Sequence, residues 1–313
     1  MKIFAWIVLG IVILIIAALL LYLLLGAVLF KIIFSRRSIT ARVLNRNLEE
    51  KMKKYNVDLC WWDKVKFSKV TTQSFDGLKL VGHLFEANSN RTVIVFHGFG
   101  QTYIEMQQYC KFFYDKNFSV LAVDARAHGE SEGTCISFGW TDRKDVVSWV
   151  KFVNEKRPND KILLFGLSMG GATVCMASGE KELQNVVGIV SDCAFDNADR
   201  QISFVMKRYK FVPKFFKKIA YSFTKRVHGF DVMQADAIKQ VKQTKIPIFF
   251  IHGQADGFVP VENLNNLYSS TPQNLRGKFV VPEADHAMSY VVAGAVYEKK
   301  MCDFLKSHTS LFS

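Results

Sequence analysis

The chain has 313 residues, half of them hydrophobic, which is enough to bury a large core. Its formal net charge of +13 is spread along the sequence, with no zinc-finger spacing and no RNA-binding signature, so a nucleic-acid partner is not expected. Among the partners that suit a basic chain, an anionic membrane surface remains. The six cysteines include no C-x-x-C pair of the metal-binding type, and free thiols in a reducing compartment are expected.

The N-terminal segment from Ile3 to Phe30 contains no charged residue. About 20 apolar residues are enough to span a bilayer, whereas a signal peptide has an apolar core of only about 7–15 residues and a small-residue cleavage site. No such site occurs at 34–37, so the segment predicts an uncleaved single-pass anchor. Only Lys2 precedes it, and the positive-inside rule favours a cytoplasmic C-terminal domain because more basic residues follow it, namely Lys31, Arg36, Arg37 and Arg42.

Beyond the anchor, the pattern predicts a charged helix over 38–55 and a hairpin around Asp76-Gly77. Strands and helices then alternate, which is typical of an α/β domain with a mostly parallel sheet. Thr141 is the expected N-cap of one of these helices. The expected strands are 92–96, 120–124, 161–167, 186–191, 246–251 and 279–281, and the expected helices are 104–114, 142–154, 171–178 and 297–305.

An apolar run beginning at Lys161 ends abruptly in the pentapeptide Gly-Leu-Ser-Met-Gly at 166–170. This G-x-S-x-G pattern is typical of a nucleophile elbow, in which a buried strand turns sharply into a helix. The glycines are expected because a Cβ beside the strained serine would collide with a neighbouring strand or helix. The turn would lift the Ser168 hydroxyl clear of the sheet. Taken alone, the pentapeptide could also be a chance turn.

Two later residues are candidate partners for Ser168. Asp256 lies in the segment 252–260, directly after a predicted strand, and His286 follows the last predicted strand. Asp192 also follows a predicted strand and is the rival candidate for the acid. Asp285 is adjacent to His286 and is therefore poorly placed to face its ring.

The order of these three residues, together with two loops, resembles the serine α/β-hydrolase superfamily, and within it the lipase, esterase and peptidase-like group. The segment 97–100 (HGFG) resembles the oxyanion loop of that group, and 124–131 resembles its D-x-R-x-H-G-x-S segment. The resemblance runs from about Val70 to the C-terminus. It implies an α/β-hydrolase fold, with a mostly parallel central sheet and helices on both faces.

The resemblance also implies roles for individual residues. Ser168 would attack an acyl carbon, His286 would take its proton and later deliver it to the leaving group, and Asp256 would hold the imidazole tautomer. The backbone N–H groups of Phe99 and Met169 would form the oxyanion hole. The expected role of the remaining polar loop residues is to shape the loops, and these are His97, Arg126 and His128.

A segment at about 195–240 stands where such hydrolases carry a lid. Pro213 suits the start of a helix there, and the apolar residues at 216, 219, 220 and 223 would form one stripe on it. The stripe is expected to cap the active site. The lysines at 214, 217, 218 and 225 would either meet water or contact anionic lipid headgroups.

Together these observations predict a transmembrane anchor at 1–35, a helical connector at 36–65 and an α/β-hydrolase domain at 66–313. The expected activity is hydrolysis of an ester with a hydrophobic acyl group. The same triad would also serve a serine peptidase or an acyltransferase, and an idle interaction module is a further alternative. A small-molecule acyl substrate and membrane lipid are the expected partners, and no cofactor or metal is expected because no metal cluster or dinucleotide fingerprint occurs.

Overall fold

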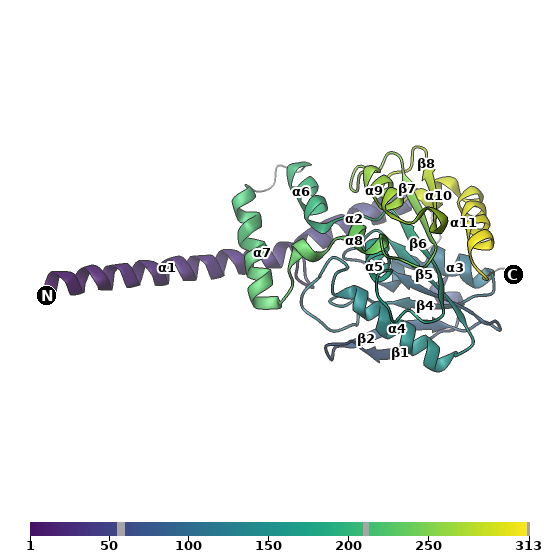
Figure 1. Ribbon diagram of the computed structural model, residues 1–313, viewed down its shortest axis with the longest axis horizontal. Coiled ribbons are helices and arrows are strands. Elements are labelled where there is room, and N and C mark those ends of the chain that lie inside the picture. The colour runs from purple at the N-terminus through teal and green to yellow at the C-terminus, as the bar shows by residue number, and fades with distance from the viewer. Residues whose placement is uncertain (55–59, 209–212, 312–313) are drawn as a thin grey trace.

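The computed structural model describes residues 1–54, 60–208 and 213–311, and a long N-terminal helix projects from its α/β body (Figure 1). The body contains an eight-stranded sheet in the order β1-β2-β4-β3-β5-β6-β7-β8. β2 is antiparallel to β1 and to β4, and the remaining pairs are parallel. The strands are β1 (Ser68–Gln73), β2 (Lys79–Phe85), β3 (Arg91–Phe96), β4 (Ser119–Val123), β5 (Lys161–Leu167), β6 (Val186–Asp192), β7 (Ile248–Gly253) and β8 (Arg276–Val281).

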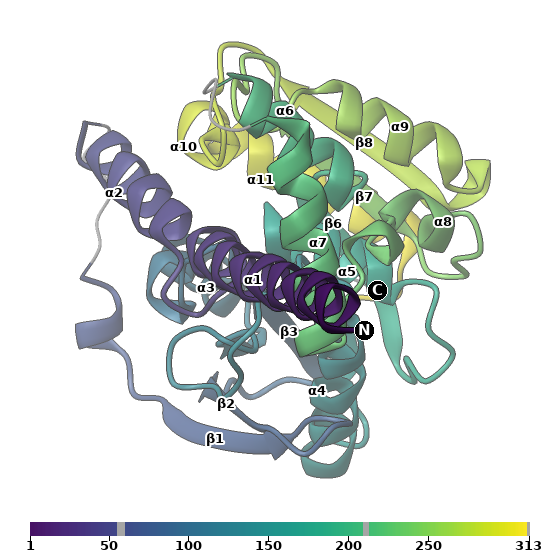
Figure 2. The same cartoon turned by 90° about the vertical axis from the view of Figure 1, so that its left-hand side faces the viewer.

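Helices cover both faces of this sheet (Figure 2). One face packs against α4 (Asp142–Lys156), α5 (Met169–Ala177), α8 (Ala237–Val241) and α9 (Glu262–Ser270). The other packs against α3 (Gln107–Asp115) and α11 (Ala295–His308). The central strands are mostly apolar because both of their faces are buried. The predicted α/β architecture with a mostly parallel sheet is confirmed. The short helices are η1 (Trp62–Lys64), η2 (Tyr103–Met106), η3 (Val232–Gln234), η4 (Gln273–Leu275) and α10 (Ser289–Ala293).

The apolar N-terminal segment forms α1 (Lys2–Ile33), and α2 (Ile39–Lys54) follows it; the predicted end of α2 at residue 55 lies outside the described residues. The last turns of α1 pack into the body. Phe34, just beyond the helix, is fully buried, and the Ile136 amide donates to its carbonyl at 2.6 Å. The Arg36 guanidinium donates to the carbonyls of Gly129 and Ser131. The end of α1 and the residues just after it therefore pack directly against the α/β body.

The insertion between β6 and β7 carries α6 (Ala198–Arg208) and α7 (Lys214–His228), which begins directly after Pro213. α7 runs across α1 (Figures 1 and 2). At the crossing, a Cβ on Gly26 would lie 2.4 Å from Cδ2 of Phe223, so glycine permits the close approach. The rings of Phe30 and His228 stack there with centroids 3.9 Å apart.

Thr141 is the N-cap residue of α4, as predicted, but its side chain does not cap the helix. Its own backbone is helical and its side chain makes no capping hydrogen bond. The Ser137 hydroxyl instead accepts from the Thr141 amide at 2.9 Å and donates to the Asp142 carboxylate. In the first turn of α4, the Arg143 amide donates to the Gly139 carbonyl and the Lys144 amide to the Thr141 carbonyl.

Candidate active site

Ser168 lies in the turn between β5 and α5 in a strained conformation, with φ 55° and ψ −113°. Strain of this kind in a non-glycine residue persists only where the surroundings enforce it. Two glycines make the turn possible. A Cβ on Gly166 would lie 2.2 Å from the Gly170 carbonyl oxygen, and a Cβ on Gly170 would lie 2.1 Å from that of Phe96. The Ser168 amide donates to the Asp192 carbonyl at 2.8 Å, which ties the turn to β6.

The structure brings Ser168, His286 and Asp256 into one hydrogen-bonded chain. Ser168 Oγ lies 2.9 Å from His286 Nε2, and His286 Nδ1 lies 2.7 Å from Asp256 Oδ2. The three side chains come from the ends of β5, β7 and β8, which share one edge of the parallel sheet. This geometry allows the imidazole to take a proton from the serine while the carboxylate fixes its tautomer.

Asp256 is fixed by its own loop. Its Oδ1 accepts from the amides of Phe258 and Val259 at 2.9 and 2.7 Å. His252 Nε2 lies 3.2 Å from its Oδ2 and 2.8 Å from the Val259 carbonyl. Burial alone would raise the pKa of Asp256, but His286 and His252 outweigh burial and hold the pKa of this carboxyl below its usual range. Asp256 therefore stays ionised at neutral pH and can stabilise an imidazolium.

The rival carboxylates lie elsewhere. Asp192 accepts a hydrogen bond from the Tyr297 hydroxyl at 3.0 Å, and burial raises its pKa to about 6. Its other oxygen has no partner among the described residues. Asp285 accepts from the amides of Gly257 and His286 and so braces the loop that holds the histidine. Asp256 is the carboxylate that reaches His286 Nδ1.

Phe99 and Met169 stand beside Ser168 around one cavity. Within the described part of the chain, neither backbone N–H has a hydrogen-bond acceptor in the protein. Met169 begins α5, so its amide is one of the donors that the first turn of a helix leaves unsatisfied. Both amides are therefore available to an oxyanion at Ser168.

Two histidines shape the loop that carries Phe99. His97 Nε2 accepts from the Ala125 amide at 3.0 Å, and His128 Nε2 accepts from the Gly100 amide at 3.1 Å. Each ring has its Nδ1 within 2.9 Å of a backbone carbonyl, which suits a neutral imidazole donating from Nδ1. Burial lowers the pKa of His128 to about 3, so its ring stays neutral.

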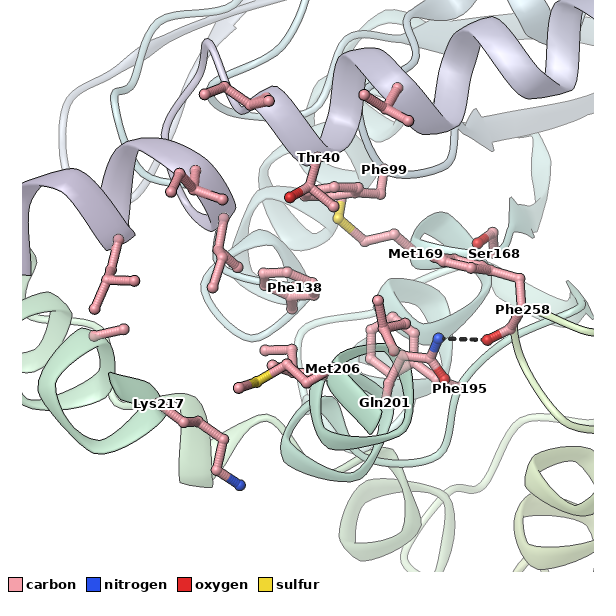
Figure 3. Close-up of a pocket in the computed structure, with 18 of the residues that line it drawn as sticks. Thr40, Phe99, Phe138, Ser168, Met169, Phe195, Gln201, Met206, Lys217 and Phe258 are labelled. Atoms are coloured by element: carbon pink, nitrogen blue, oxygen red, sulfur yellow. Dashed lines mark hydrogen bonds between the residues drawn. The ribbon is translucent and has the colours of Figure 1, made fainter. Parts of the chain in front are cut away.

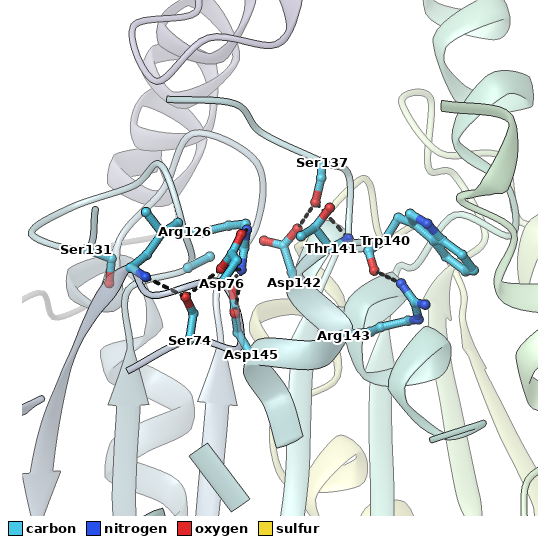
Figure 4. A network of polar contacts seen from close by, with 12 residues as sticks. Ser74, Asp76, Arg126, Ser131, Ser137, Trp140, Thr141, Asp142, Arg143 and Asp145 are labelled. Atoms are coloured by element: carbon cyan, nitrogen blue, oxygen red, sulfur yellow. Dashed lines mark hydrogen bonds and ion pairs between the residues drawn. The ribbon is translucent and has the colours of Figure 1, made fainter. Parts of the chain in front are cut away.

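Arg126 anchors the neighbouring loop through a polar network (Figure 4). Its guanidinium donates two hydrogen bonds of 2.6 Å to the buried Asp145, on α4, and two of 3.0 and 3.1 Å to Asp76 at the hairpin turn. Asp124 accepts from the Tyr103 and Glu130 amides at 3.1 and 2.8 Å. The D-x-R-x-H-G-x-S segment thus ties β4 to the hairpin and to α4.

Ser168 lines an apolar cavity of about 260 Å³ (Figure 3). Its described lining is hydrophobic apart from Thr40, Ser168, Gln201 and Lys217. The Lys217 ammonium bonds to Asp199 and Ser203 at 2.7 and 2.8 Å. The apolar lining residues are Leu29, Ile32, Ile33, Ile39, Val43, Phe99, Phe138, Met169, Phe195, Ile202, Val205, Met206, Phe216, Ala220 and Phe258.

Some features of this site were not predicted from the sequence. His252 is the first residue of the segment that contains Asp256, and its four-residue spacing from the acid is a signal that sequence could have used. Gln201 lines the cavity and donates to the Phe258 carbonyl at 2.8 Å, while its buried Oε1 has no hydrogen-bond partner among the described residues. The contribution of α1 to the cavity has no local sequence signal.

One group in the described part of the chain has the spacing of a metal site: Cys193, Asp256 and His286, with ligand atoms within 4.8 Å of one another. Asp256 and His286 already bond to each other there. Burial raises the pKa of the Cys193 thiol well above its usual range, which opposes the thiolate that metal ligation needs. These residues therefore fit a triad better than a metal centre.

Comparisons with known proteins identify a family and two relatives. A family described as "Serine aminopeptidase, S33" matches residues 87–232. The uncharacterized protein YqkD of Bacillus subtilis (strain 168) is 25% identical over 225 residues, which cover 71% of this chain and 73% of YqkD. The uncharacterized protein YfhR of Escherichia coli (strain K12) is 24% identical over 240 residues, which cover 74% and 78%.

Solved structures show the same fold. The Pyrococcus furiosus esterase Pf2001 aligns with a TM-score of 0.66 at 24% identity, covering 79% of this chain and 94% of the esterase. The esterase EaEST from Exiguobacterium antarcticum aligns with a TM-score of 0.58 at 14% identity, covering 76% and 100%. The fold is that of the hydrolases in which a parallel sheet presents a serine on a sharp turn. The chain therefore has the α/β-hydrolase fold.

Proposed function

We propose that this protein is a membrane-anchored serine hydrolase that cleaves esters of hydrophobic acyl groups. The observation that carries the proposal is the hydrogen-bonded chain from Ser168 through His286 to Asp256 at one side of an apolar cavity. Ser168 Oγ forms a bond to the acyl carbon as the ester C–O bond breaks, and His286 transfers the serine proton to the departing alcohol. Water then attacks the acyl-enzyme with His286 as base, releasing the acid and restoring the serine.

The cavity favours an ester over a peptide with a free N-terminus, the substrate that the matching family's description suggests. An aminopeptidase needs a group that accepts the substrate ammonium. The described lining of the cavity contains no aspartate or glutamate, and its one charged residue is Lys217. An apolar acyl chain, by contrast, gains about 0.8 kcal/mol per methylene buried in such surroundings.

Replacing Ser168 by alanine tests the proposal. We expect Ser168→Ala to lower kcat on p-nitrophenyl butanoate by on the order of 10⁶ and to abolish labelling by a fluorophosphonate probe. Ser178→Ala is the matched control, since it removes another buried hydroxyl beside α5, one that donates to the Cys175 carbonyl. A Ser168→Ala protein with a tenth of the wild-type activity would refute the assignment. An unlabelled wild-type protein would support an idle interaction module instead.

The proposed anchor is α1. Its 32 residues give a length of about 48 Å, and its most apolar window has a mean hydropathy of 3.3 with none of it buried. A bilayer core is about 30 Å thick, so the helix is long enough to span it. The basic residues after α1 favour a cytoplasmic body. We expect the protein to stay in the membrane fraction after alkaline and high-salt washing, and its release by salt would contradict the proposed span.

A further inference from the structure

The cavity beside Ser168 is partly walled by the N-terminal helix. Leu29, Ile32 and Ile33, in the last two turns of α1, line it together with Ile39 and Val43 at the start of α2. Ser168 lines the same cavity from the elbow, and Phe99 does so from the oxyanion loop. The segment proposed as an anchor is thus also part of the substrate site (Figure 3).

The position of these residues on α1 sets the depth of the cavity relative to a membrane. The side chains of α1 are mostly exposed up to Leu24, and the helix becomes buried at Gly26, where α7 crosses it. Gly26 and Ile33 are seven residues apart, which is about 10 Å along a helix axis. The cavity therefore lies within about two turns of the exposed apolar part of α1, at the level where a spanning helix would leave the bilayer.

The exposed side chains of α7 also suit a position where α1 would leave the bilayer. α7 runs across α1 on the side of the body from which the free part of α1 projects (Figure 1). Its Phe215 side chain is 64% exposed, with the exposed Lys214 and Lys218 near it at the start of the helix, and Val227 is 54% exposed near the other end. Exposed apolar side chains interleaved with lysines are typical of a helix that lies in a lipid–water interface.

We propose that the last turns of α1 form the acyl-binding wall of the active site, and that the substrate is an acyl ester held in the bilayer. Its chain would pass between α1, α2 and the α6–α7 insertion and reach Ser168 along apolar side chains. Ile33 would then limit the length of acyl chain that fits. This inference rests on the proposed hydrolase activity and adds the class of substrate and the role of α1.

The first test measures chain-length preference with the full-length protein in nanodiscs, using p-nitrophenyl acetate, octanoate and hexadecanoate. We expect Ile33→Trp to lower the octanoate-to-acetate ratio of kcat/KM about tenfold, because a bulky ring would fill the acyl site. Ile33→Ala should shift the preference toward hexadecanoate. The control is Leu24→Trp, which adds the same ring at a position that is 63% exposed and does not line the cavity.

Activity on acetate and labelling by a fluorophosphonate report on the triad separately from the acyl wall. Unchanged chain-length ratios in both Ile33 variants, with acetate turnover retained, would overturn the proposed wall and leave the hydrolase intact. If Ile33→Trp lost acetate turnover through misfolding, the direction of change in Ile33→Ala would still decide. Absence of turnover and labelling in the wild type would refute the proposed function itself.

The second test distinguishes bilayer from water as the source of the substrate. p-Nitrophenyl hexadecanoate is placed either in the nanodisc that holds the protein or in separate protein-free vesicles at the same total concentration. We expect at least tenfold faster turnover of the ester in the protein's own nanodisc. Equal rates, or octanoate turnover without any hexadecanoate turnover in the nanodisc, would overturn the proposed supply from the bilayer.

Discussion

The two sides of the active site are built in different ways. The triad stands on loops that follow β5, β7 and β8, and backbone amides hold Asp256 at 2.7 and 2.9 Å. The cavity wall opposite is made by α1, α2, α6 and α7, and the side chains that line it are mostly apolar. Hydrogen bonds fix atoms within a few tenths of an ångström, whereas apolar contacts mainly require that volume be filled.

This difference in construction indicates that the triad governs ester cleavage, whereas the cavity wall governs which acyl chains are accepted. A change at the triad should lower turnover of every ester, whatever its acyl chain. A change in the α1–α7 wall should alter which chains are accepted and leave the cleavage step intact. The following predictions test this division, beginning with the largest expected effect.

Asp256→Asn should retain the fold and lower kcat by about 10⁴ on short and long esters alike, because the amide no longer holds the required imidazole tautomer. Asp192→Asn is the matched control, since its carboxylate bonds to Tyr297 and not to His286. Turnover of acetate and octanoate esters measures both variants. A larger loss in Asp192→Asn than in Asp256→Asn would show that the acid is wrongly assigned.

Gly26→Leu should separate α1 from α7, since even a Cβ at this position would lie 2.4–2.8 Å from the Phe223 side chain. We expect about a tenfold loss of octanoate turnover relative to acetate, because the wall of the cavity shifts. Gly10→Leu is the control, since a Cβ at Gly10 meets nothing within 4 Å. Equal losses on both esters would mean that the α1–α7 contact supports the triad as well as the wall.

The smallest effect concerns stability. Burial raises the pKa of Asp192 from 3.8 to about 6. At pH values between these two, the Asp192 carboxyl is therefore protonated in the folded protein and ionised in the unfolded chain. Stability attributable to Asp192 should therefore fall as pH rises from about 4 to 6 and stay lower above it. Asp192→Asn should raise the unfolding free energy at pH 8 by up to about 3 kcal/mol and leave it nearly unchanged at pH 4.

Comparing the thermal unfolding of wild type and Asp192→Asn at these two pH values checks this prediction. A variant destabilised at pH 8 and unchanged at pH 4 would show that the carboxylate is needed in its ionised form, and equal destabilisation at both pH values would show that the amide does not fit the site. Asp256 should affect the pH dependence of stability in the opposite direction, because its pKa in the folded protein is lowered. Its contribution to stability is present above about pH 4 and is lost as the pH falls further.

The sequence by itself determined those features that depend on neighbouring residues. The elbow at 166–170 is recognisable because only glycine fits beside a strained serine, and the same contacts appear in the structure at Gly166 and Gly170. The apolar length of α1 and the alternation of strands and helices are likewise local patterns. The order of Ser168, Asp256 and His286 predicted candidates for a triad but could not measure their separation.

Only the tertiary structure distinguished between residues whose local sequence suits the same role equally well. Asp192 and Asp256 both end a strand region, and the loop geometry after β7 brings Asp256 to His286. Among the lysines of the insertion, Lys217 pairs with Asp199 and Lys225 with Asp231, so they are not simply a solvated face. The acyl wall joins side chains separated by well over a hundred residues, because packing selects partners by shape and volume, which no local pattern encodes.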